Sequence, residues 1–216
     1  TKLLENTFRH VNVALVNELA MFAHDLGIDV WEAIDAASTK PFGYLRFTPG
    51  PGVGGHCLPI DPSYLSWRVR RSLGHSFRFV ELANDVNDHM PDYVVRRVVA
   101  GLNRRHQAVN GSRVLLLGLA YKRNTSDARE SPSTRIAELL LGLGAEVRAA
   151  DPHVLDEHVD ARIARVEATT EQLAGADVVV LLVDHDGFDL GAVAHHAQLV
   201  LDTRHCLPDS PTVEHL

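Results

Sequence analysis

The chain has 216 residues and a formal net charge of -7 at pH 7, and 45 % of its residues are apolar, as in ordinary globular proteins. The negative charge argues against nucleic acid or an anionic membrane as the general partner, although it leaves room for one local basic pocket. Cys57 and Cys206 make no disulfide framework, no apolar run could span a bilayer and no signal peptide opens the chain, so we expect a cytoplasmic protein.

The first half of the chain has a helical pattern. Apolar residues recur at spacings of three and four from Leu4 to Leu26, and Gly27 follows as a stop signal. This apolar stripe is wider than one packing partner needs, so a second surface, such as another subunit, is expected to cover the rest. Because Thr1 is not methionine and already stands inside this pattern, the sequence indicates a portion of a longer protein. Further helices are expected over residues 29–38, 62–73, 76–87 and 91–105.

A glycine-rich stretch, GPGVGGHCLPIDPSYLSW at residues 50–67, places Cys57 before one of these helices. Asp61 followed by Pro62 is typical of an N-cap and a first helical residue, so Cys57 would lie just upstream of a helix N-terminus. The partial positive charge there favours a thiolate. From the residues alone, Cys57 is equally well a small buried side chain and Asp61 a helix cap only.

The pattern changes after Gly111. Apolar runs at residues 114–119, 147–150, 178–183 and 199–201 alternate with helical stretches, which predicts a parallel, doubly wound sheet. Ser131, Pro132 and Gly144 mark the ends of the helix after the first of these strands. We therefore expect an α/β protein with two domains, residues 1–107 and 108–216.

The loop after the first expected strand lacks the G-x-G-x-x-G of dinucleotide sites and instead carries Tyr121, Lys122, Arg123 and Arg129. Cationic donors at the carboxyl ends of parallel strands suit a phosphorylated ligand, although a solvated basic loop explains them equally well. Arg204 follows another strand and could join the same crevice. Asp151 and Asp202 are interpreted as turn residues. The histidines have no zinc-site spacing, so no metal is expected.

Three motifs in register resemble the UDP-glucose/GDP-mannose dehydrogenase family: KLLEN at 2–6, PGPGVGGHCLPIDPSYL at 49–65 and GLAYKRNTSDARESPS at 118–133. The resemblance covers essentially the whole chain. It implies an all-α central dimerisation domain followed by a Rossmann-like, UDP-binding domain. The family's N-terminal NAD-binding domain is not in the sequence.

The resemblance also implies a reaction. The family oxidises the C6 alcohol of a nucleotide sugar to a carboxylate in two NAD-linked hydride transfers. Cys57 is similar to the nucleophile that captures the C6 aldehyde as a thiohemiacetal, which is then oxidised to a thioester. Lys2 and Asn6 match the pair that stabilises oxyanion charge, and Asp61 matches the carboxylate that positions or activates water.

The remaining roles concern binding. The residues implied to contact the nucleotide sugar are Tyr44, Arg46, Gly54, Gly55, Tyr121, Lys122 and Arg204. Arg129 matches an arginine that reaches toward NAD. Ile60 stands where many UDP-glucose dehydrogenases have lysine, and the GGHC.P.DP form is more similar to the branch that acts on UDP-N-acetylglucosamine or UDP-N-acetylmannosamine.

The family forms its dimer through the long central helix, which agrees with the wide apolar stripe of residues 4–26 and predicts a homodimer. Without an NAD-binding domain, the chain is expected to be inactive alone. The competing hypothesis is a stand-alone dimeric module that binds nucleotide sugars without catalysis. A cysteine hydrolase is the third and least favoured reading, because adjacent His56 and Cys57 rarely point at each other in a loop.

Overall fold

The computed structural model describes residues 1–55, 57–155 and 159–216, and of Cys57 only the backbone. The chain divides into two compact units, Thr1–Met90 and Pro91–Leu216. The sequence placed the boundary after residue 107, whereas the units divide inside helix α4 (Arg78–Arg104). The difference arises because the helix continues past the point where its packing partners change.

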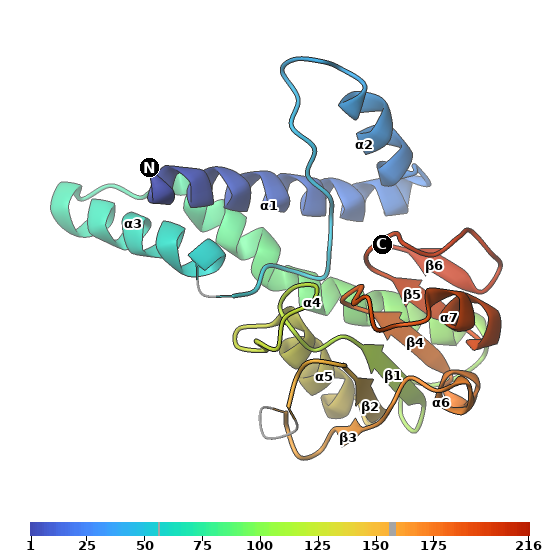
Figure 1. The fold of residues 1–216 in the computed structure, drawn as a ribbon. Coiled ribbons are helices and arrows are strands. Elements are labelled where there is room, and N and C mark those ends of the chain that lie inside the picture. The colour runs from blue at the N-terminus through green and yellow to red at the C-terminus, as the bar shows by residue number, and fades with distance from the viewer. Residues whose placement is uncertain (56, 156–158) are drawn as a thin grey trace. The chain divides into compact units, whose positions relative to one another are not determined.

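The first unit is helical (Figure 1), with α1 (Lys2–Leu26), α2 (Val30–Ser38), α3 (Cys57–Leu73) and the first part of α4. Gly27 ends α1 in the left-handed conformation, with φ of 69°, as its position predicted. The carboxylate of Asp29 caps α2 by accepting from the N–H groups of Trp31 and Glu32. Across the described residues, no helix is both long and apolar enough to cross a membrane.

Two helix boundaries differ from the prediction. Helix α3 begins at Cys57 and not at Pro62, so Asp61 lies inside the helix and is not its N-cap. Pro59 is tolerated there because N–H groups in a first turn have no intrahelical partner. Helix α4 runs through Pro91 as one element where two were expected. Proline removes one backbone hydrogen bond inside a helix. Met90 and Val94, on either side of Pro91, are fully buried, and burial of such side chains favours the continuous helix.

Helix α1 buries its small and polar face, not its large apolar side chains. The buried residues are Asn6, Thr7, His10, Ala14, Val16, Asn17, Ala20 and Ala23. The exposed large apolar residues of α1, between 38 % and 74 % exposed, are Leu3, Leu4, Phe8, Leu15, Leu19, Phe22 and Leu26. Small residues allow α2, α3 and α4 to approach α1 closely, so the expected core stripe lies on the surface of the described chain.

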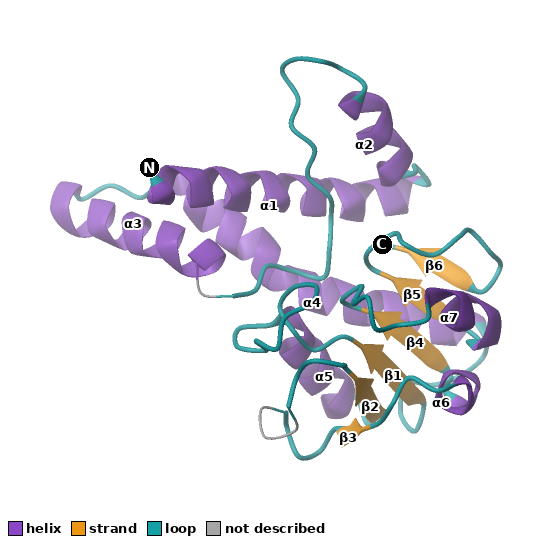
Figure 2. Ribbon diagram, in the orientation of Figure 1, coloured by secondary structure: helices purple, strands orange, loops and turns teal. Residues whose placement is uncertain are grey.

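The second unit contains a parallel sheet with the strand order β3-β2-β1-β4-β5-β6 (Figure 2). The strands are β1 (Arg113–Leu117), β2 (Glu146–Ala150), β3 (Ala164–Arg165), β4 (Val178–Leu181), β5 (Val200–Asp202) and β6 (Val213–His215). The order reverses between β1 and β4, as in a doubly wound fold, which confirms the predicted fold class. The short strands β3 and β6 were not predicted, because Ala164–Arg165 and Val213–His215 contain no apolar run like that of residues 199–201.

Helices α5 (Pro132–Gly142), α6 (Thr170–Gly175) and α7 (Leu190–His196) flank the sheet. Ser131 caps α5, with Pro132 at its first position, as the sequence predicted. Leu117 of β1 aligns with Ala150 of β2 and Leu181 of β4, so the loops that follow these strands meet at one edge. At that edge Gly118 has a φ of +92°, and a Cβ on it would lie 2.5 Å from Cβ of Val183. Only glycine fits there.

Candidate functional site

Lys2, Asn6 and Asp61 converge in the first unit. Lys2 and Asn6 lie one turn apart on α1, and Asp61 lies on α3, which packs along α1. The side-chain amide of Asn6 donates to Oδ2 of Asp61 at 2.7 Å, and Nζ of Lys2 lies 3.0 Å from the same oxygen. Arg9, which the sequence did not single out, lies with Nη1 3.4 Å from Oδ1 of Asn6. The arrangement directs two donors at a single carboxylate oxygen.

Asp61 is held in its ionised form. Hydrogen bonds from Lys2 and then from Asn6 lower the pKa of this carboxyl below its ordinary value. A lowered pKa makes a carboxylate a weaker base. The geometry therefore suits Asp61 to orienting a water molecule or a hydroxyl group more than to removing a proton.

The predicted nucleophile stands at the start of the same helix. Position 57 is the first residue of α3, one helical turn before Asp61. The side chain of Cys57 and the whole of His56 lie outside the described residues, so the role of Cys57 stays a prediction. Peptide N–H groups in the first turn of a helix stabilise a thiolate at such a position.

The other residues predicted for the substrate loop have different surroundings. Gly55 is buried with a φ of 83°, a conformation that glycine adopts readily, and Gly54 is half-buried. Tyr44 is half-buried. Arg46 is exposed and forms an ion pair with Asp35 of α2. Their contact with a substrate stays a prediction, and Arg46 would have to leave Asp35 to make it.

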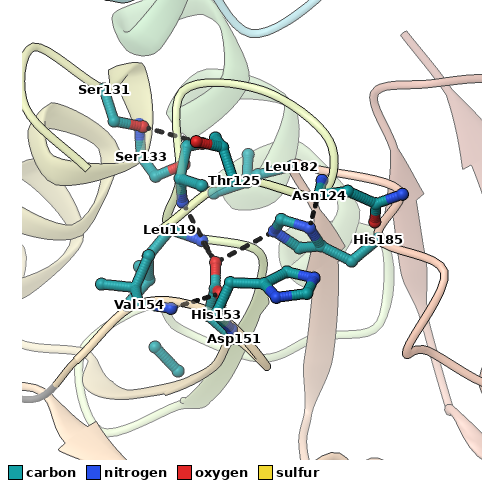
Figure 3. A network of polar contacts seen from close by, with 12 residues as sticks. Leu119, Asn124, Thr125, Ser131, Ser133, Asp151, His153, Val154, Leu182 and His185 are labelled. Atoms are coloured by element: carbon teal, nitrogen blue, oxygen red, sulfur yellow. Dashed lines mark hydrogen bonds and ion pairs between the residues drawn. The ribbon is translucent and has the colours of Figure 1, made fainter. Parts of the chain in front are cut away.

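In the second unit, Asp151 connects the loops at the carboxyl edge of the sheet (Figure 3). Its Oδ2 accepts from the N–H groups of Leu119 at 2.6 Å and Ala120 at 3.1 Å, in the loop after β1. Its Oδ1 accepts from the N–H groups of His153 and Val154, in the loop after β2. Asp151 is thus a turn residue, as predicted. It is also the hydrogen-bond acceptor for two backbone N–H groups of the loop after β1.

His185 extends this network to the loop after β4 (Figure 3). Nε2 of His185 lies 3.1 Å from Oδ2 of Asp151, and both side chains are fully buried. Nδ1 accepts from the N–H of Asn124 at 3.0 Å. From sequence, His185 was only one of the histidines that have no zinc-site spacing, and no role was predicted for it. A histidine between two aspartates gives no pattern that would reveal such a contact.

The basic residues predicted at this edge of the sheet differ in whether they already form ion pairs with aspartates of this chain. Arg129 binds Asp127 through two hydrogen bonds of 2.9 and 2.8 Å. Arg123 pairs with Asp184 and Asp186. Lys122 makes no ion pair within the described parts of the chain, and its Nζ lies 5.3 Å from the centre of the Tyr121 ring. Lys122 is therefore an exposed cation that is available to an anionic ligand.

Arg204 is anchored at the same edge. Its Nε donates to the carbonyl oxygen of Leu182 at 2.6 Å, and burial lowers the pKa of the guanidinium. Asp184, the partner of Arg123, opposes this shift, so the loops after β1, β4 and β5 share one electrostatic environment. Lys122 and Arg204 both follow strands at the carboxyl edge of the sheet, and their joint contact with a ligand stays a prediction.

The second unit also has a cavity of about 650 Å³ at the ends of β2 and β3 and beside residues 187–189, which precede α7. Its lining includes Asp151, Arg165 and Phe188. Tyr121, Lys122 and Arg204 do not line it. The cavity therefore does not by itself identify the predicted nucleotide-sugar contacts.

Comparison with known proteins identifies the family. The sequence model of the UDP-glucose/GDP-mannose dehydrogenase family, central domain, matches residues 1–89, and that of the family's UDP binding domain matches residues 115–209. The chain belongs to the UDP-glucose/GDP-mannose dehydrogenase family. The central domain contains the Lys2, Asn6 and Asp61 cluster, and the UDP binding domain contains the Asp151 network.

Curated relatives within this family are similar along most of the chain. A UDP-N-acetyl-D-mannosamine dehydrogenase of Methanococcus maripaludis is 37 % identical over 187 residues, which is 87 % of this chain and 41 % of the relative. An NDP-N-acetyl-D-galactosaminuronic acid dehydrogenase of Ralstonia nicotianae is 38 % identical over 208 residues, 94 % of this chain and 46 % of the relative. The chain thus spans less than half of each.

Solved structures of the family agree with the fold. The UDP-D-ManNAc dehydrogenase of Pyrococcus horikoshii superposes with a TM-score of 0.81 at 32 % identity, over 99 % of this chain and 50 % of that one. An NDP-N-acetyl-D-galactosaminuronic acid dehydrogenase of Methanosarcina mazei gives 0.84 at 29 % identity, over 100 % of this chain and 49 % of that one.

Proposed function

We propose that the chain is the nucleophile-bearing and UDP-binding portion of an NAD-dependent nucleotide-sugar 6-dehydrogenase. The observation that carries the proposal is the convergence of Lys2 and Asn6 on Asp61, one helical turn from position 57. Cationic and amide donors at such a point stabilise the oxyanion that forms when a thiolate adds to an aldehyde. Cys57 then carries the sugar as a thiohemiacetal and a thioester, so the reactive aldehyde is not released.

In the proposed reaction Asp61 acts last. The carboxylate orients the water that hydrolyses the thioester, and the lowered pKa keeps it ionised and able to accept a hydrogen bond from that water. Lys2 and Asn6 neutralise charge on Asp61 while no oxyanion is present. Hydrolysis releases the uronate and restores the Cys57 thiol.

The described residues do not build an NAD site. The loop after β1 lacks the glycine pattern that receives a dinucleotide pyrophosphate, and Arg129, the residue proposed to reach NAD, is paired with Asp127. We therefore propose that NAD binds mainly to a domain outside this chain and that the chain alone is inactive. The proposed compartment is the cytoplasm, where a free thiol such as that of Cys206 stays reduced.

The proposed substrate is a UDP-N-acetylhexosamine rather than UDP-glucose. The names of the relatives from Methanococcus maripaludis and Ralstonia nicotianae and the GGHC.P.DP sequence with Ile60 support this preference. The test is a full-length protein carrying this chain, assayed for NADH formation with UDP-glucose, UDP-N-acetylglucosamine, UDP-N-acetylmannosamine and GDP-mannose. We expect an N-acetylated UDP-sugar to give the highest kcat/KM. Highest activity with UDP-glucose or GDP-mannose would contradict the substrate preference, and activity of the chain alone would contradict the proposal that NAD binds to a domain outside it.

Substitution of Lys122 by alanine is expected to weaken UDP binding by about tenfold, because an unpaired cation near a diphosphate contributes on the order of 1.5 kcal/mol. Isothermal titration with UDP measures the effect. Lys40→Ala removes another exposed lysine, in the first unit and away from the sheet edge, and is expected to leave the affinity unchanged. Equal affinities for the two variants would remove Lys122 from the proposed site.

The exposed apolar face of α1 is proposed to form a homodimer. A double substitution, Leu15→Glu with Leu19→Glu, places two charges on each copy of that face, where the side chains are 53 % and 48 % exposed in the single chain. We expect light scattering after size exclusion to show a dimer for the wild type and a monomer for this variant, with a dimer Kd raised at least about 100-fold. Leu143→Glu is the control, since it charges an exposed leucine outside α1. A wild-type monomer, or a dimer that survives both charges, would rule out this interface.

A further inference from the structure

A series of hydrogen bonds between polar side chains runs through the first unit. It begins at the backbone N–H of Gly50, which donates to Oδ1 of Asn17 on α1 at 2.9 Å. Asn17 donates to Oδ1 of Asn87 on α4, also at 2.9 Å. Nδ2 of Asn87 then lies 3.4 Å from Nδ1 of His10. The beginning of the glycine-rich loop is thereby connected to two helices.

From His10 the series continues to α3. Nε2 of His10 lies 2.7 Å from Oδ1 of Asn84, and the Asn84 amide donates to Oγ of Ser63 at 3.0 Å. Ser63 donates to the carbonyl oxygen of Pro59 at 2.7 Å. The series therefore ends on the backbone of the first turn of α3, just after position 57.

All donors in this series can point in one direction, from Gly50 to Pro59. That order requires a neutral His10, which carries its proton on Nε2 and accepts at Nδ1. Burial lowers the pKa of His10 and so favours the neutral form, while the hydrogen bond with Asn84 and, less strongly, the carboxylate of Asp88 on α4 oppose this shift. The network is thus matched to one protonation state of its central residue.

The central side chains of this network are buried, and burying polar groups costs free energy of hydration. Asn17 is fully buried, and His10 and Asn87 are only 1 % and 3 % exposed. Polar side chains at such positions lose their hydration, and apolar side chains of the same shape would hold the helices together at least as well. What apolar residues could not do is hold the N–H of Gly50 and connect it to α3.

We propose that His10, Asn17 and Asn87 are positioning residues that fix both ends of the segment between Gly50 and Pro59 and thereby hold the backbone on either side of position 57, from which the proposed nucleophile acts. The proposal rests on the proposed role of Cys57 as the nucleophile. None of the three residues is assigned contact with substrate. They act through the backbone on either side of position 57.

Three variants of the full-length protein test the proposal. Asn17→Ala removes the acceptor of the Gly50 N–H. His10→Gln keeps one donor and one acceptor in the series but cannot be protonated. Asn12→Ala is the matched control, because Asn12 lies on the same helix and its side chain bonds to the carbonyl oxygen of Phe8, outside the network.

Two readouts are needed, one of them independent of dehydrogenase activity. The first is kcat and KM for the nucleotide sugar. The second is the rate of Cys57 alkylation by iodoacetamide at pH 7, followed by peptide mass spectrometry to separate Cys57 from Cys206. For Asn17→Ala we expect kcat to fall at least about tenfold with KM within about twofold, and alkylation to slow about threefold. His10→Gln and Asn12→Ala are expected to stay within about twofold of wild type in both.

If Asn17→Ala and Asn12→Ala gave the same kcat and the same alkylation rate, the proposal would be overturned. A change of KM alone would also overturn it, because the residues would then act on substrate binding. If Asn17→Ala does not fold, Ser63→Ala, which removes the last two bonds of the series at a half-buried position, carries the same expectations. A full-length protein that oxidises no nucleotide sugar, but whose Cys57 alkylation depends on Asn17, would refute the proposed function and leave the positioning of the loop supported.

Discussion

Replacing Cys57 by serine in the full-length protein is expected to lower uronate formation by at least about 10³-fold while UDP-sugar binding stays within about threefold of wild type. A serine hydroxyl at neutral pH carries almost no anion, whereas a thiol at a helix N-terminus is partly ionised. The covalent steps therefore fail, while the residues proposed to bind UDP lie on the second unit and are unchanged. Steady-state NADH formation and titration with UDP-sugar measure the two quantities separately.

The control for this substitution is Cys206→Ser. Burial raises the pKa of the Cys206 thiol to about 12, so it is not a nucleophile at neutral pH, and the variant is expected to retain activity. An active Cys57→Ser enzyme would contradict the covalent mechanism. Loss of binding in parallel with activity would instead make Cys57 a structural residue.

Replacing Asp151 by alanine is expected to destabilise the second unit by about 3–5 kcal/mol, a large part of the stability of an ordinary domain. The substitution leaves the buried N–H groups of Leu119, Ala120 and Val154 without their acceptor and removes the partner of His185. Urea unfolding followed by circular dichroism measures the loss. Asp186→Ala, an exposed aspartate in the loop after β4, is expected to cost less than about 1 kcal/mol.

The same carboxyl predicts the pH dependence. Burial alone would raise the pKa of Asp151, but hydrogen bonds from His185 and from backbone N–H groups outweigh it and hold the pKa well below its ordinary value of 3.8. Because the folded pKa is the lower one, the stability that Asp151 contributes is fully present above about pH 5 and is lost as the pH falls below about 4. Asp151→Ala should therefore show a flatter loss of stability with acid than wild type. If the free energy of unfolding fell equally steeply with acid in both proteins, ionisation of Asp151 would contribute little to the pH dependence.

Much of the second unit could be predicted from sequence, because its signals are local. The apolar runs at residues 114–117 and 178–181 are long enough to identify buried strands, and Ser131 with Pro132 identifies the start of α5. The two-residue strand β3 forms only because a neighbouring strand offers it hydrogen bonds. Asp151 could be recognised as a turn residue, but the Leu119 and Ala120 N–H groups it binds lie more than thirty residues away.

The helical unit was harder to predict, because periodic large apolar residues usually mark the buried face of a helix, whereas on α1 they mark the exposed face. The spacing of Leu15, Leu19 and Phe22 predicted the helix correctly, but these side chains are exposed while Asn17 is buried. The predicted start of α3 was five residues too late, because an aspartate followed by proline is the usual sequence of an N-cap and a first helical residue. In the structure, the Asp61 carboxylate is bound instead by Lys2 and Asn6. Of the candidate site, residue types and their motifs were predictable from sequence, and the buried network behind them was not.

Arg204 and Lys122 differ in when each side chain loses its conformational entropy, during folding or during ligand binding. Its hydrogen bond to the carbonyl oxygen of Leu182 already fixes the side chain, so the conformational entropy of a long arginine, on the order of 2 kcal/mol at room temperature, is lost during folding and not during binding. An anion that meets Arg204 encounters a preorganised charge, whereas one that meets Lys122 must also order a mobile chain. In the proposed UDP site, Arg204 would therefore supply a preorganised charge that orients the ligand, and Lys122 a cation that is ordered only when the ligand binds.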